Sequence, residues 1–161
     1  MRAVAQRVAR AQVSVDDAVT GVIAHGLLVY LAAAPTDGAH EVEWCTRKLA
    51  ELRIFPDDDG RMNRSVVEAG GAVLLVSQFT LYADTRKGRR PSFVDAAAPA
   101  VAEPLLARVA DALRERGLRV EGGRFGAHML VDAVNDGPVT ILLDSADAER
   151  PRRGASDRPP A

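Results

Sequence analysis

The feature of the chain that most constrains its fold is a run of purely apolar side chains at residues 72–76, directly after Gly70 and Gly71. An unbroken apolar run of this length is typical of a strand covered on both faces. A second apolar run at residues 26–31 predicts another buried strand. The chain is therefore predicted to fold around a central β-sheet.

Patterns of alternation and helical spacing predict the remaining elements. Alternating side chains predict strands at residues 2–9 and 11–15, and Thr20–Gly21 predicts a turn. Apolar residues at helical spacing predict helices at 41–52 and 102–116, the second stopped by Gly117. Two further strands are predicted at 131–134 and 139–143.

Composition places the chain among globular proteins and limits its partners. It has 161 residues, 47% of them hydrophobic, which suits one domain with its own core. Its net charge of −1 argues against a protein that coats nucleic acid, so any RNA contact needs a local basic patch. A single cysteine, Cys45, excludes an internal disulfide and fits a reducing compartment. Charged residues interrupt the apolar residues near the start, so we expect neither a signal peptide nor a membrane span, and a cytoplasmic location.

The last part of the chain differs in composition from the rest. From Ser145 onward it is rich in Pro, Arg, Asp and Ala and has no apolar periodicity. Such a segment cannot bury enough apolar surface to fold by itself. The chain is therefore divided into a domain at residues 1–144 and a disordered tail at 145–161.

A segment with three polar side chains and one aromatic ring follows the central strand without a break: Ser77, Gln78, Phe79 and Thr80. The end of a buried strand holds side chains rigidly beside loops, so this segment is a candidate site. Ser77 and Thr80 are candidate nucleophiles, and successive backbone N–H groups could form an oxyanion hole. The same residues also suit a strand that simply ends in turn-compatible side chains.

A strongly basic loop follows the same segment. Residues 86–90 contain four cations, Arg86, Lys87, Arg89 and Arg90, around Gly88. A phosphate backbone is the obvious partner for such a cluster. A solvated surface loop is the alternative, and closeness to residues 77–80 favours RNA.

The tetrapeptide Asn135–Asp136–Gly137–Pro138 predicts a tight turn between two strands. A Gly-Pro peptide can also be cis at modest cost, which would turn two carbonyl oxygens to the same side. A rigid pair of carbonyls could act as a gauge that tests the shape and polarity of a bound ligand. The three histidines are scattered, and no Cys/His spacing predicts a metal site, so neither metal nor cofactor is expected.

Taken together, these segments resemble the D-aminoacyl-tRNA deacylase family. Residues 73–81, continuing through Asp84 to residues 90–93, resemble its first signature, and residues 134–140 resemble its second. Shorter matches occur in the family's order, and the resemblance covers roughly residues 1–143. They lie at residues 6–8, 26–29, 52–55, 62–63 and 122–125, and at Met129. Ala32 stands where the family commonly has glycine.

The resemblance implies an α+β fold, a compact antiparallel β-sheet or barrel-like domain with two flanking helices, working as a homodimer. It implies hydrolysis of the ester between a D-amino acid, or glycine, and the tRNA 3′ end. Ser77 to Thr80 would line the pocket, with the N–H groups of Phe79 and Thr80 polarising the carbonyl. Gly137 and Pro138 of the other subunit would reject L-amino acids. Arg7 and Met129 would support the pocket, and Arg86, Lys87, Arg89 and Arg90 would meet tRNA phosphates.

Two other functions remain open from the sequence. One is a nucleic-acid-binding protein without catalysis, against which the net charge argues. The other is a related deacylase of tRNA mischarged with L-alanine. For the deacylase reaction itself, the reactive group is either Thr80 or the 2′-hydroxyl of the terminal adenosine.

Overall fold

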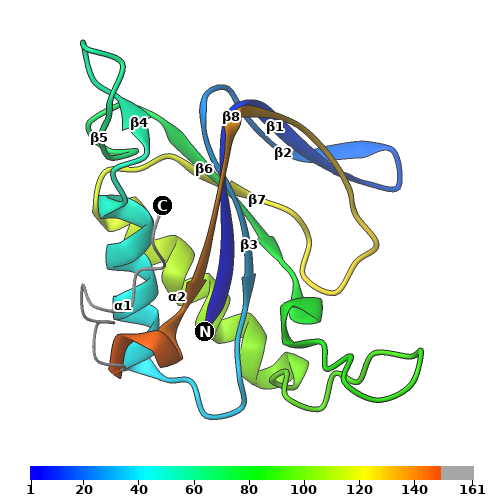
Figure 1. Cartoon of the computed structure of the whole chain (residues 1–161). Helices are drawn as coiled ribbons and strands as arrows, with labels where there is room; N and C mark the ends of the chain where they lie inside the picture. The colour runs from blue at the N-terminus through cyan, green and yellow to red at the C-terminus, as the bar shows by residue number, and fades with distance from the viewer. Residues whose placement is uncertain (150–161) are drawn as a thin grey trace.

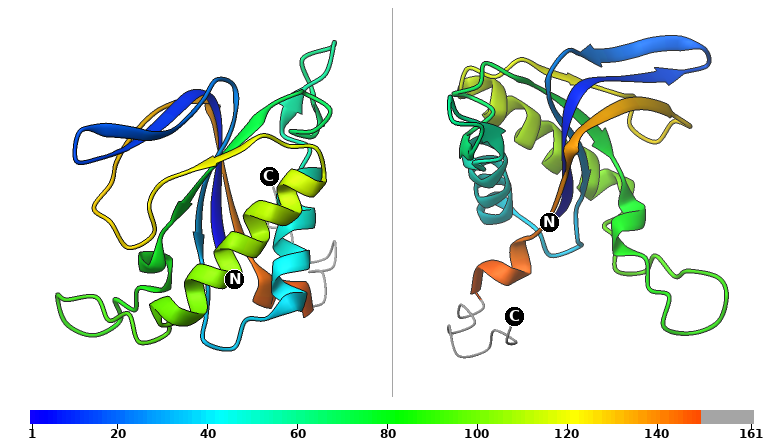
Figure 2. Two further views of the ribbon diagram at one scale, coloured as in Figure 1. Left: turned by 180° about the vertical axis from the view of Figure 1, so that it is seen from behind. Right: turned by 45° about the horizontal axis from the view of Figure 1, so that its top comes forward.

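The structure is a computed structural model that describes residues 1–149 (Figure 1). One sheet is formed by β1 (Arg2–Val15), β2 (Ala18–Ile23), β3 (Gly26–Ala32), β6 (Ala72–Ser77), β7 (Val120–Gly122) and β8 (Leu130–Asp144). Two helices, α1 (Ala39–Glu51) and α2 (Pro99–Glu115), lie side by side against one face of it (Figure 2). A small hairpin is formed by β4 (Phe55–Pro56) and β5 (Met62–Arg64), and two 3-10 helices are η1 (Phe79–Tyr82) and η2 (Ser145–Glu149).

The predicted α+β class with two flanking helices is confirmed, but the sheet is mixed. Its order is β2-β1-β3-β6-β7, with β8 on the other edge of β1. The pairs β3–β6 and β6–β7 are parallel, whereas the pairs that β1 makes are antiparallel. Parallel neighbours need a crossover connection, and α1 and α2 supply the two crossovers. The helices therefore cover the parallel part of the sheet.

The sheet curls until it is nearly closed where β2 approaches β7. A Cβ built on Gly21 would lie 2.6 Å from the carbonyl oxygen of Gly122. Only glycine permits two backbones to come this close. The curl creates two apolar clusters, the larger one between the sheet and the helices and the smaller one inside the curl around Leu28 and Leu74.

The predicted apolar strands and both helices are confirmed, with ends that differ by a few residues. The division of the N-terminal region into two strands is wrong, because β1 is continuous across residues 9–10. The alternation fails there because β1 changes neighbours: residues 2–8 pair with β3, and residues 11–15 pair with β2. The Thr20–Gly21 turn is also wrong, since both residues lie within β2.

The region around residue 145 is held to the start of the chain. The ammonium group of Met1 forms an ion pair with Asp37 over 2.8 Å and donates a hydrogen bond to the hydroxyl of Ser145. The backbone N–H of Ser145 donates to the carbonyl of Met1. Residues 145–149 of the expected tail thus form η2, and the rest of that tail lies outside the described residues. No helix in the described part of the chain is long and apolar enough to cross a membrane.

Candidate active site

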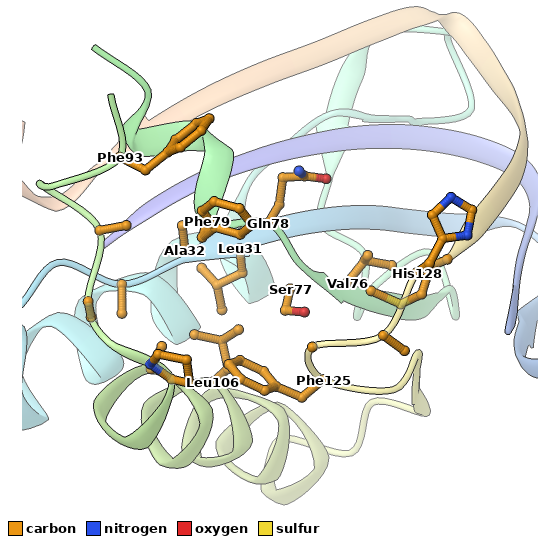
Figure 3. Close-up of a pocket in the computed structure, with 18 of the residues that line it drawn as sticks. Leu31, Ala32, Val76, Ser77, Gln78, Phe79, Phe93, Leu106, Phe125 and His128 are labelled. Carbon is orange, nitrogen blue, oxygen red and sulfur yellow. The ribbon is translucent and has the colours of Figure 1, made fainter. Parts of the chain in front are cut away.

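A cavity of about 590 Å³ opens at the C-terminal end of β6 (Figure 3). Its walls come from the ends of β3 and β6, from η1, from the segment that leads into α2, and from the loop between β7 and β8. Most of the lining is apolar and includes Leu31, Leu106, Phe93 and Phe125. Because parallel strands end at the same edge, β3 and β6 bring residues distant in sequence to one opening.

Three of the four residues predicted to form the site line this cavity: Ser77, Gln78 and Phe79. The backbone N–H of Gln78 donates to the carbonyl of Leu31 over 2.9 Å, which continues the β3–β6 ladder to the cavity edge. Phe79 is 57% exposed and packs edge-to-face on Phe93, with ring centroids 5.1 Å apart. The end of β6 is therefore fixed, while the aromatic ring beside it faces the opening.

The fourth residue, Thr80, is not part of the cavity lining. Its hydroxyl accepts a hydrogen bond from the side-chain amide of Gln78, and its carbonyl accepts one from Ala83. Phe79 and Thr80 are the first two residues of η1, whose leading N–H groups have no partner within the helix. Among the described residues, neither of these N–H groups donates to a carbonyl. Two adjacent N–H donors are thus available next to Ser77.

The loop between β7 and β8 forms the opposite wall, and it contributes residues that the sequence did not single out. A turn from Arg124 to Ala127, closed by a 3.2 Å hydrogen bond, directs the ring of Phe125 towards Leu106 and Ser77 (Figure 3). Met129, predicted to support the pocket, lines it as expected from its position. Phe93, Phe125 and His128 were not predicted as site residues, although Phe93 and Phe125 belong to segments that carry the family resemblance.

The predicted turn at residues 135–138 is wrong, because both flanking segments belong to β8 and pair with β1 in the same direction. Gln6 pairs with Thr140 and Val8 with Asn135, so a two-residue step along β1 faces a five-residue step along β8. The extra residues form a bulge that projects from the sheet. Gly137 has φ of +122°, the Gly137–Pro138 peptide is cis, and both residues are exposed.

Arg7 lies beneath this bulge and does not line the cavity. Its Nε lies 2.9 Å from a carboxylate oxygen of Asp136, and its Nη1 donates to the carbonyl of Ile54 over 2.6 Å. The Arg7 side chain is only 12% exposed. Gly137 and Pro138 are likewise absent from the lining of their own chain's cavity. Arg7 therefore steadies the bulge rather than the cavity wall.

The basic loop lies beyond η1 and is exposed throughout residues 85–90. Arg86 pairs with Asp84 through two side-chain contacts of 2.9 and 2.7 Å, and these hydrogen bonds lower the pKa of Asp84 to about 2. The charge of Arg86 is thus already matched. Among the described residues, Lys87, Arg89 and Arg90 form no ion pair. These three are the cations of the loop that remain available to an anion.

The chemistry of the cavity is defined by hydrogen-bond donors rather than by an acid–base pair. No hydroxyl in its lining is hydrogen-bonded to a histidine or a carboxylate within residues 1–149. In the same part of the chain, no group of three or more His, Cys, Asp and Glu side chains could hold a metal ion. The arrangement can polarise a carbonyl through the N–H groups of Phe79 and Thr80.

Comparison with known proteins agrees with this geometry. Residues 4–144 match the family model described as D-Tyr-tRNA(Tyr) deacylase. The chain is 61% identical to the D-aminoacyl-tRNA deacylase of Anaeromyxobacter dehalogenans (strain 2CP-C), over 90% of this chain and 97% of that protein. It is 54% identical to the D-aminoacyl-tRNA deacylase of Chloroflexus aurantiacus (strain ATCC 29364 / DSM 637 / Y-400-fl), over 97% and 98% of the two chains.

Solved structures have the same fold. One titled c-Myc DNA Unwinding Element Binding Protein superposes with a TM-score of 0.85 at 39% identity, covering 90% of this chain and 99% of that one. Another, titled as a structural analysis of a probable eukaryotic D-amino acid tRNA deacylase, has a TM-score of 0.76 at 21% identity, over 88% and 97% of the two chains, and supports the fold alone. The family model spans nearly all of the described domain and the relatives match along almost their full length, so the chain belongs to the D-aminoacyl-tRNA deacylase family.

Proposed function

We propose that this protein hydrolyses the ester bond between a D-amino acid, or glycine, and the 3′ end of tRNA, and spares L-aminoacyl-tRNA. The observation that carries this proposal is the pair of free N–H donors on Phe79 and Thr80 at the edge of a largely apolar cavity. Donors aimed at a developing oxyanion stabilise the tetrahedral intermediate of acyl transfer. The names of the relatives point to the same substrate class.

In the proposed reaction the substrate supplies the reactive group. The cavity lining offers Ser77 as its only hydroxyl in the described chain, and Ser77 has no base beside it. A hydroxyl without an adjacent base is a poor nucleophile at neutral pH. The 2′-hydroxyl of the terminal adenosine is held beside the ester by covalent geometry, which gives it a high effective concentration. The 2′-hydroxyl takes a proton from water as the water oxygen adds to the acyl carbon. It passes its own proton to the 3′-oxygen as the bond between that oxygen and the acyl carbon breaks.

The proposed chirality gauge requires a second copy of the chain. Gly137 and Pro138 are exposed on the bulge of β8 and do not line their own cavity. The same strand exposes apolar side chains at Leu130, Val134 and Leu142, and within residues 1–149 it pairs with no strand other than β1. A two-fold dimer would cover these side chains and carry each bulge to its neighbour's cavity reciprocally. In this assembly Gly137 and Pro138 reject an L-side chain by steric clash.

We propose that Lys87, Arg89 and Arg90 contact phosphates of the tRNA. Arg86 can do so once its hydrogen bonds to Asp84 are broken. Neutralising Lys87 and Arg89 should weaken tRNA binding and flatten its salt dependence, because each lost phosphate contact removes counterion release. The rate at saturating tRNA should change little. An unchanged salt slope would mean that this loop is an ordinary solvated surface and does not contact tRNA phosphates.

The test of the proposed function is the rate of deacylation of matched substrates. We expect cleavage of D-tyrosyl-tRNA and glycyl-tRNA, with L-tyrosyl-tRNA spared. Equal rates on both tyrosyl enantiomers would remove the gauge role of Gly137 and Pro138. Cleavage of tRNA mischarged with L-alanine in preference to D-tyrosyl-tRNA would favour the related L-alanyl activity. Tight binding to duplex DNA without ester cleavage would favour a non-catalytic protein.

A further inference from the structure

The cavity contains one titratable side chain that the proposed reaction does not use. Of the residues that line it in the described chain, His128 alone can carry a charge. Its imidazole is exposed and lies at the far end of the cavity from Phe93 (Figure 3). It forms no hydrogen bond or ion pair among residues 1–149. A histidine at the rim of an otherwise uncharged cavity is in position to meet a charged part of the ligand that the apolar walls cannot hold.

The turn that precedes His128 carries a second basic side chain, that of Arg124, on the same loop. Gly126 adopts φ of +73°, and the hydrogen bond from the N–H of Ala127 to the carbonyl of Arg124 closes the turn. Phe125 is half-buried in the cavity, whereas Arg124 and His128 on either side of it are exposed. Arg124 makes no ion pair in the described part of the chain. The loop thus presents one apolar anchor flanked by two basic side chains.

The chemistry of the substrate decides which group these side chains meet. If the aminoacylated adenosine occupies the apolar cavity, the phosphate that joins it to the preceding nucleotide must leave through the open rim. A phosphate needs cationic or N–H partners, and an apolar wall provides none. The α-ammonium group of the amino acid is the other charge in reach, but a protonated imidazole would repel it.

We propose that His128 binds the phosphate of the tRNA 3′ end at the rim of the cavity, with Arg124 on the same loop as a second cationic contact. This inference rests on the proposed function, because it takes the aminoacylated end of tRNA as the ligand. Imidazole N–H groups donate hydrogen bonds to phosphate oxygens. The guanidinium of Arg124 adds a planar set of N–H donors.

Other charged groups on the elements around His128 could compete with a phosphate for its imidazole. Asp132 on β8 accepts a hydrogen bond from Gln12, and Glu121 on β7 pairs with Arg119. Asp16 and Asp17 form the turn just beyond the Ser14–Leu130 pair of β1 and β8. Arg124 is the charged residue on the loop itself. The acidic groups on β7 and β8 already have partners, which leaves the imidazole free for an external anion.

The test compares wild type with His128→Gln, which cannot be charged, and His128→Arg, which always is. The probe is tRNA that carries D-tyrosine through a 3′-amide, so that binding is measured without hydrolysis. We expect His128→Gln to raise the Kd roughly two- to fivefold, as for one exposed charge pair. It should also reduce the slope of log K against log salt by about 0.7, as for one lost contact with single-stranded phosphate.

The other arms separate this role from a structural one. His128→Arg keeps a cationic N–H donor at the rim and should keep the low Kd and the salt slope of wild type. His40→Gln, at an exposed histidine on α1, is the matched control and should bind the probe as wild type does. A His128→Gln variant whose Kd and salt slope equal those of wild type would overturn the inference while leaving the proposed function intact. Absence of all D-tyrosyl-tRNA cleavage by wild type would instead count against the proposed function.

Discussion

Arg7, in the middle of β1, forms an ion pair over 2.9 Å with Asp136 in the bulge of β8. Arg7 is nearly buried and also donates to the carbonyl of Ile54, so one guanidinium links β1, the segment before β4 and the bulge. Asp136 is 53% exposed, and an ion pair of this kind contributes little to the stability of the fold. The main role of the contact is therefore to fix the position of Gly137 and Pro138.

Replacing Arg7 with methionine tests this positioning role. We expect kcat/KM on D-tyrosyl-tRNA to fall about 10- to 100-fold, because a small displacement of a group at the reacting centre costs that much. Arg116→Met is the control, since Arg116 also forms an ion pair with an exposed carboxylate, that of Glu51, between the helices. Activity would be measured beside thermal unfolding. A large loss of stability with unchanged activity in the folded fraction would contradict the positioning role.

Gly137 is required by its backbone conformation and by its surroundings. Its φ is +122°, and a Cβ there would lie 2.7 Å from a methyl carbon of Val139 and 3.1 Å from Nη2 of Arg7. We expect Gly137→Ala to cost about 1–3 kcal/mol locally and to shift the bulge, with a loss of activity or of discrimination against L-tyrosyl-tRNA. Gly60→Ala is the matched control, because Gly60 has φ of +78° with no atom within 4 Å of the added Cβ. Both variants share the backbone strain, so equal activities would mean that the shape of the bulge does not matter.

The exposed apolar edge of β8 makes the assembly testable. Leu142 is 79% exposed, and a charge there should prevent a second copy from covering the strand. We expect Leu142→Glu to be monomeric by light scattering and inactive, while keeping the secondary structure of wild type by circular dichroism. Val67→Glu, at a 44% exposed apolar side chain after β5, should remain dimeric and active. A fully active monomer would show that each cavity works without its neighbour.

How far the sequence predicts this fold depends on how local each signal is. The runs at residues 26–31 and 72–76 are apolar because both faces of the sheet are covered there, and that signal survives without tertiary information. The bulge at residues 135–138 has the composition of a turn, and pairing with the long strand β1 overrides that preference. Only the register of β1 against β8 reveals the difference.

Residues of the candidate site also differ in how far a local sequence signal predicts them. Ser77, Gln78 and Phe79 follow a strand that the sequence identifies, so their place at its end could be predicted. Phe125 and His128 come from a loop without periodicity, more than forty residues along the chain, and line the same cavity as Ser77 only because β7 and β8 flank the curl. That Thr80 is not part of the cavity lining depends on the turn of η1, which no pattern in the sequence predicts.

Cys45 gives the fold a measurable dependence on pH. Burial on α1 raises the pKa of its thiol to about 12, from an ordinary value near 9. The folded state therefore holds the proton while the unfolded chain releases it, so stability is intact below pH 9 and is lost as the pH rises towards 12. We expect the free energy of unfolding of wild type to fall by about 1 kcal/mol more than that of Cys45→Ala between pH 9 and 10. Urea titrations of both proteins would check this, and identical slopes would mean that the thiol ionises normally in the folded state.

Thr80 provides the sharpest test of where the reactive group comes from. Its hydroxyl already accepts a hydrogen bond from Gln78 and does not line the cavity, whereas its backbone N–H is free. Thr80→Ala keeps that N–H, so we expect it to retain activity within about tenfold of wild type. Thr80→Ser, which restores the hydroxyl, serves as the matched control.

A D-tyrosyl-tRNA whose terminal residue lacks the 2′-hydroxyl should bind normally and be cleaved at least about a hundredfold more slowly, since the neighbouring group is gone. An inactive Thr80→Ala with normal folding and tRNA affinity, together with normal cleavage of the deoxy substrate, would make Thr80 the nucleophile. An acyl group trapped on its hydroxyl would lead to the same conclusion.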